Sequence, residues 1–159
     1  MSDALCRFIE AAFSEASRPA YGTLSIPTYD DEDTNAHFGR TDWRDHDVTG
    51  LREHDSSLGF FTPPAFRYYL PAFLIASIRD PDGADVIPER IISELERAIS
   101  SDAERLRAFT SREREALSVF VEWWRDFIYP SSSVQPLERR QRAELTALAD
   151  ALRASDRNA

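Results

Sequence analysis

The sequence contains no lysine, a single cysteine and only five glycines among its 159 residues. The lone cysteine, Cys6, excludes an internal disulfide and is typical of a reducing compartment. No stretch of uncharged apolar residues approaches the length of about 18 that a membrane span needs. The N-terminus also lacks the apolar run of a signal peptide. We therefore expect a protein without a membrane span, located in the cytoplasm.

Basic charge is scarce as well. The 19 basic residues, all arginine, are outnumbered by 28 acidic residues, and the formal net charge is −9. Binding to nucleic acid or to anionic lipid needs a basic face, so neither partner is expected. Complementary charge favours a basic protein as the partner instead. The oligomeric state is not predicted.

Apolar residues recur at helical spacing over most of the chain. The pattern predicts helices over residues 3–17, 63–79, 88–100, 101–109, 111–128 and 136–154. Thr110 with Glu113, and Ser101 with Glu104, have the spacing of a capping box. The predicted fold class is mainly α: a single-domain, compact bundle of about five to six helices over residues 1–154. Residues 155–159 are expected to form a frayed tail.

Residues 19–59 differ from the rest, because they show little helical periodicity. Between residues 30 and 55, nine acidic residues stand against three arginines. We expect a long, acidic, irregular segment with one short helix near residues 48–54, tied to the body by Phe38, Trp43 and Leu51. Irregular segments of this length are more often functional or mobile than accidental.

Residues 60–80 form the most apolar stretch, with apolar residues on all sides of the predicted helix, which indicates burial. Pro71 lies in the middle of it and cannot donate a hydrogen bond to the carbonyl of Arg67. Proline inside a helix costs about 3 kcal/mol. We therefore predict that the helix kinks near residues 67–70 or breaks into two.

Residues 61–72, with the sequence FTPPAFRYYLPA, resemble the motif of DUF6714, an uncharacterised bacterial family of unknown function. The sequence YDDEDT at residues 29–34, Trp43, and the sequence FTSREREALSVFVEWW are also similar, so the resemblance covers about residues 19–128. Pro64 departs from the motif, because the commoner residue at this position is glutamate. The family has no assigned activity, so the resemblance implies fold boundaries and no mechanism.

Three histidines in the acidic segment, His37, His46 and His54, are the metal-ligand candidates. Their spacings of nine and eight residues match no established zinc motif. We interpret them as solvated imidazoles with raised proton affinity, and predict no metal site and no cofactor. The sequence shows no glycine-rich phosphate loop and no HExxH, and no catalytic residue is predicted.

Two hypotheses of function remain. The first is a protein-binding module with an acidic surface, built like an immunity protein against a basic toxin. The second is a small enzyme or ligand binder with a pocket of tyrosine, arginine and carboxylate groups near Pro71. Arg67 either clamps the carboxylates of residues 30–33 or reaches solvent. The candidate binding residues are Asp30, Asp31, Glu32, Asp33, Trp43, Arg67, Tyr68 and Tyr69.

Overall fold

The computed structural model describes residues 2–27, 31–131 and 135–154; the side chains of Asp31 and Glu32 also lie outside the description. Within these residues the fold is mainly helical, and the only β structure is an isolated bridge between Ser25 and Phe61. Five helices exceed ten residues and the others are short. The chain divides into two compact units, residues 1–109 and 110–159. The single domain over residues 1–154 stays a prediction, and the predicted tail lies outside the described residues.

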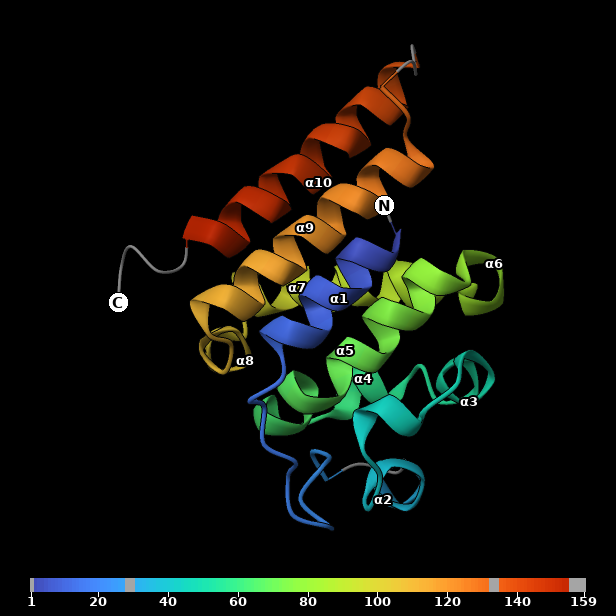
Figure 1. The fold of residues 1–159 in the computed structure, drawn as a ribbon. Coiled ribbons are helices and arrows are strands. Elements are labelled where there is room, and N and C mark those ends of the chain that lie inside the picture. Colours follow the sequence, from blue (N-terminus) through green and yellow to red (C-terminus); the bar gives the residue numbers. More distant parts are fainter. Residues whose placement is uncertain (1, 28–30, 132–134, 155–159) are drawn as a thin grey trace. The chain divides into compact units, whose positions relative to one another are not determined.

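The first helix, α1 (Ser2–Ala12), packs its buried face of Leu5, Cys6 and Ile9 within the first unit, against α5 (Figure 1). It ends earlier than the predicted residue 17. The hydroxyl of Ser14 donates to the carbonyl of Ala11 at 3.0 Å, which offers the backbone an alternative to another helical turn.

Helix α5 (Pro63–Arg79) is the central element of the first unit. Twelve of its 17 residues are buried, and it packs against α1, α7 and the short helices around it. The predicted break at Pro71 is wrong, because α5 continues through that residue. Packing on every side compensates for the hydrogen bond that proline cannot make. The predicted bend at residues 67–70 stays a prediction.

The acidic segment is more regular than expected. It contains α2 (Asp31–Phe38), a 3₁₀-helix η1 (Trp43–Asp45), α3 (Val48–Glu53) and α4 (Ser57–Phe60). The short helix near residues 48–54 is confirmed, whereas an irregular chain over the whole of 19–59 is wrong. Helices of three to eight residues are too short to produce a visible apolar period. Phe38, Trp43 and Leu51 are buried, as predicted.

Three helices complete the first unit: α6 (Pro81–Ala84), α7 (Ile87–Ser100) and α8 (Ala103–Arg107). The predicted capping box of Ser101 with Glu104 is wrong. Asp102 caps α8 instead, and its carboxylate accepts from the backbone N–H of Arg105 at 3.2 Å. On this short helix Ala103 is exposed, whereas the charged residue Arg105 is buried.

Arg105 is only 1% exposed and joins four segments of the first unit. Its guanidinium donates to the Glu94 carboxylate of α7 at 2.6 Å and to the carbonyls of Leu58 and Phe61 at 3.2 and 2.8 Å. It also lies over the ring of Phe66, 4.4 Å from the centroid. A buried cation is tolerated only with such a set of partners. Arg105 therefore fixes the end of α4 and the start of α5 against α7.

The second unit is a hairpin of α9 (Ser111–Ile128) and α10 (Pro136–Ala154), which run antiparallel side by side (Figure 1). The predicted capping box of Thr110 with Glu113 is confirmed. From their apolar character and helical spacing, Phe127 and Leu137 are expected to be buried, but Phe127 is 51% exposed and Leu137 is 65% exposed. The ring of Phe127 is covered only in part, by stacking on Trp123 and Trp124, with centroid distances of 5.6 and 5.5 Å.

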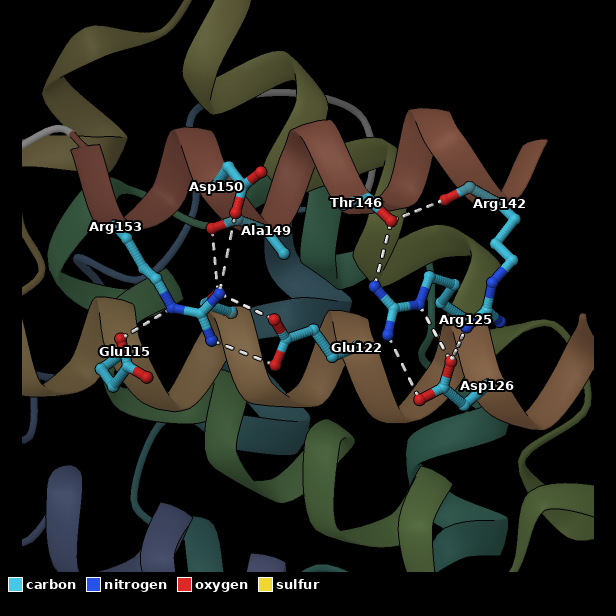
Figure 2. A network of polar contacts seen from close by, with 10 residues as sticks. Glu115, Glu122, Arg125, Asp126, Arg142, Thr146, Ala149, Asp150 and Arg153 are labelled. Carbon is cyan, nitrogen blue, oxygen red and sulfur yellow. Dashed lines mark hydrogen bonds and ion pairs between the residues drawn. The ribbon is translucent and has the colours of Figure 1, made fainter. Parts of the chain in front are cut away.

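Polar contacts connect the two helices of this hairpin. Figure 2 shows Arg153 of α10 between Glu115 and Glu122 of α9, with nitrogen–oxygen distances of 3.0 and 2.7 Å. At the other end, Arg125 of α9 donates to the hydroxyl of Thr146 at 3.0 Å. The hairpin is therefore joined by arginine pairs as well as by the buried leucines of α10.

Candidate functional site

Tyr68 and Tyr69, two of the predicted binding residues, hold the loop that follows α2 against α5. The hydroxyl of Tyr68 donates to the Asp42 carboxylate at 3.2 Å, and that of Tyr69 donates to the carbonyl of Phe38 at 2.6 Å. Burial raises the pKa of both phenols, and the charge of Asp42 raises it further. Both tyrosines are therefore neutral donors with a positioning role, and they set where the chain enters η1.

The other predicted binding residues fall in different places. Trp43 is buried in η1, with the guanidinium of Arg44 lying 4.2 Å above its ring. Arg67 is half-buried on α5, and Asp33 is exposed on α2. Asp30 and the side chains of Asp31 and Glu32 lie outside the described residues. The clamp between Arg67 and the carboxylates of residues 30–33 therefore stays a prediction.

A cleft of about 270 Å³ opens next to Trp43, between α1, the η1–α3 segment and α5. Its apolar wall comes from Trp43, Val48 and one face of α5 just after Pro71. Its polar groups come from α1, from the residues around η1, and from the end of α5. The lining residues are Glu10, Trp43, Arg44, His46, Asp47, Val48, Ala72, Ile75, Ala76, Arg79 and Asp80.

The two arginines of the cleft are each paired with a carboxylate. Arg44 lies 3.1 Å from Asp42, which is outside the cleft lining, and Arg79 lies 3.5 Å from Glu10. Burial raises the pKa of Asp42, but hydrogen bonds from Arg44 and Tyr68 outweigh it, so the pKa falls below its ordinary value. Asp42 is thus a carboxylate that neutralises Arg44.

Two further carboxylates of the cleft, Asp47 and Asp80, are exposed helix caps. The Oδ1 atom of Asp47 accepts from the backbone N–H of Gly50 at 2.8 Å, which begins α3. The Oδ1 atom of Asp80 accepts from the N–H of Gly83 at 2.9 Å, which begins α6. In the described part of the chain, no arginine lies within 4 Å of either carboxylate. The cleft therefore holds two carboxylates without a cationic partner among these residues.

The three histidines form a cluster, which the sequence interpretation missed. The rings of His37 and His54 are stacked with centroids 3.7 Å apart, and His46 lies 5.2 Å from His37. All three rings lie close to the ring of Phe38, with centroid distances of 4.7 Å for His37, 4.8 Å for His46 and 6.2 Å for His54. The interpretation of the three histidines as solvated imidazoles is therefore wrong.

Their predicted raised proton affinity is wrong for two of the rings. Burial, followed by the neighbouring His37, lowers the pKa of His46 to about 4. Burial, followed by His54, lowers the pKa of His37. Within residues 2–27, 31–131 and 135–154, no group of three or more His, Cys, Asp or Glu side chains is arranged to hold a metal ion.

A second feature is a set of exposed carboxylates on or beside three consecutively packed helices, since α3 packs against α6 and α6 packs against α7 (Figure 1). We call it the acidic face, and define it as Glu53, Asp82, Asp85 and Glu89. Arg52 neutralises one member, Asp85, at 2.8 Å. Within the described chain, no arginine lies within 4 Å of Glu53, Asp82 or Glu89. Sequence reasoning placed the acidic surface only in residues 30–55 and missed the contribution of α6 and α7.

The family of unknown function DUF6714 matches residues 1–136, and the chain belongs to this family. No curated protein and no solved structure matches it. The match ends where α10 begins, at Pro136. Across the residues that the structure covers, no helix combines the length and apolarity needed to cross a bilayer. The cytoplasmic location stays a prediction.

Proposed function

We propose that this member of the DUF6714 family is a protein-binding module that captures a basic surface of its partner on the acidic face. The observation that carries the proposal is the set of exposed carboxylates Glu53, Asp82 and Glu89, which no arginine neutralises among the described residues. They come from three different helices that pack on α5 or on one another, so their spacing is held by the fold. A rigid group of like charges of this kind suits recognition of a fixed basic surface.

The physical gain from such a face is mainly in the association rate. A surface of one sign steers an oppositely charged partner and raises the on-rate by about 10- to 1000-fold. At physiological ionic strength the screening length is about 8 Å, so higher salt weakens the attraction. Immunity proteins that neutralise basic toxins use charge in this way, and the same mode of action is proposed for this chain. The chain's net charge of −9 supports it.

The test compares two variants with the same change of net charge. A protein captured from cell extract is first identified and purified, and its affinity for the wild-type chain is measured by calorimetry. Glu53→Lys with Asp82→Lys reverses the acidic face, whereas Glu96→Lys with Glu104→Lys reverses two exposed acids of α7 and α8. We expect the first pair to raise the Kd at least ~10-fold and the second pair to raise it less than ~3-fold.

Folding is checked by the melting temperature of each variant. Equal losses of affinity in the two double variants would refute the acidic face as the binding surface. So would a purified partner whose contact surface, mapped by crosslinking, carries no excess of basic residues.

The alternative, a small enzyme or a ligand binder near Pro71, stays a prediction. One observation bears on it: the hydroxyls of Tyr68 and Tyr69 already donate to Asp42 and to the carbonyl of Phe38. A ligand that needed these phenols would have to displace contacts that hold η1 in place.

A further inference from the structure

The cleft beside Trp43 combines an apolar wall with two carboxylates that have no cationic partner among the described residues. We propose that it seats one arginine side chain of the basic partner, a role that rests on the proposed function. The guanidinium lies between Asp47 and Asp80, and the aliphatic stem lies along the face of α5 that lines the cleft.

The charges of the cleft favour a cation over an anion. Arg44 and Arg79 are already paired, with Asp42 and Glu10, so neither offers a free positive charge. Asp47 and Asp80 each use one oxygen, Oδ1, to cap a helix. Carboxylates accept several hydrogen bonds, so both retain acceptor capacity for an incoming N–H group.

The shape of the lining favours an arginine in particular. Ala72, Ile75 and Ala76 on α5, together with Val48, form an apolar surface that an alkyl stem can cover. The planar guanidinium presents five N–H donors, which lets one group bond two separate carboxylates. The cleft volume of about 270 Å³ is just below the range of about 300–1,000 Å³ typical of small-molecule pockets. A single side chain is therefore the matching occupant.

His46 also lines the cleft, and its side chain does not repel a cation that binds there. Its pKa of about 4 keeps the imidazole neutral at physiological pH. Its Nε2 atom lies 2.7 Å from the hydroxyl of Thr41, which holds the ring in position. The ring therefore adds a polar edge to the cleft without adding positive charge.

The experiment uses butylguanidinium as the probe, without any partner protein. Binding is followed by NMR through the indole N–H signal of Trp43 in ¹⁵N-labelled protein, assigned by comparison with Trp43→Phe. We expect a saturable shift with a Kd in the millimolar range, as is usual for a fragment with few contacts, roughly −4 kcal/mol at ~1 mM. Pentanamide, which has a similar shape and no charge, is expected to produce no saturable shift.

The variants remove charge while keeping the helix caps. Asparagine caps a helix about as well as aspartate, so Asp47→Asn and Asp80→Asn preserve α3 and α6. Each is expected to raise the Kd of butylguanidinium at least ~3-fold, and both together at least ~10-fold, because each removes a charged acceptor. Asp82→Asn, which removes one charge from the acidic face outside the cleft lining, is the matched control and is expected to change the Kd less than ~2-fold.

Several results would overturn the arginine site. These are the absence of a saturable shift with butylguanidinium, equal binding of pentanamide, or a Kd that responds to Asp82→Asn as strongly as to Asp47→Asn. Because no partner is present, such a failure leaves the capture of a partner by the acidic face untouched. Conversely, a partner insensitive to Glu53→Lys with Asp82→Lys refutes the proposed function while butylguanidinium binding is unaffected.

Discussion

Mild acid is expected to destabilise the first unit through His46. The imidazole packs against Phe38, with ring centroids 4.8 Å apart, and lies 5.2 Å from the ring of His37. Protonation would place a positive charge in this half-buried cluster. Burial and His37 lower the pKa to about 4, from an ordinary value of 6.5, although Asp45 and Asp47 act in the opposite direction.

The sign and size of the effect follow from linkage. The folded state disfavours the charged imidazole, so the stabilisation is complete above pH 6.5 and is lost as the pH falls from 6.5 to about 4. A difference of about 2.5 pKa units corresponds to about 3 kcal/mol in full, of which about 2 kcal/mol is lost between about pH 7 and about pH 5. Solvent reaches part of the ring and screens the charge, which reduces the expected loss to about 1–2 kcal/mol.

The assay is urea unfolding, followed by circular dichroism at about pH 7 and about pH 5, for the wild type and for His46→Gln. Glutamine does not titrate, and its amide can still bond the hydroxyl of Thr41. We expect the variant to lose about 1–2 kcal/mol less than the wild type over this interval, while carboxylate titration affects both chains equally. Equal losses in the two chains would refute the reasoning, as would an NMR titration that places the pKa of His46 at 6.5 or above.

Two further predictions concern arginines with structural roles. Replacing Arg105 by Met leaves the Glu94 carboxylate and the carbonyl of Phe61 without this donor. We therefore expect the free energy of unfolding to fall by about 3–5 kcal/mol. A fall of less than about 1 kcal/mol, measured by urea unfolding, would contradict this role. Replacing Arg153 by Met, which removes the contacts with Glu115 and Glu122 drawn in Figure 2, is expected to cost about 1 kcal/mol, and less in high salt because the pairs are partly exposed. Thermal unfolding at low and high salt checks the second prediction, which fails if the difference between variant and wild type does not depend on salt.

The long helices could be predicted from the sequence because their apolar residues repeat over many turns. Helix α9 begins after Thr110 and closes its capping box with Glu113, and α5 begins with two prolines where no N–H is needed. Burial of most of α5 also followed from apolar residues on every side. Each of these signals lies within one continuous segment, so pattern and propensity alone reveal it.

The short helices of the acidic segment carry no such signal. Helices α2, α3 and α4 have four to eight residues, and tertiary contacts stabilise them rather than periodicity. Burial of Phe38 and the bonds from Tyr68 and Tyr69 hold this segment on α5. Those contacts join residues about 30 positions apart, beyond the reach of local pattern reasoning.

Sequence thus indicated the helical class, the excess of acid, the family and the anchoring role of Trp43. Only the tertiary structure brought the histidines onto Phe38, buried Arg105 among the carbonyls of Leu58 and Phe61, and opened a cleft beside Trp43. The physical reason is the same in each case. A charge or a ring acquires its pKa, its partner and its exposure from groups that are neighbours in space, and the linear order of residues does not record those neighbours.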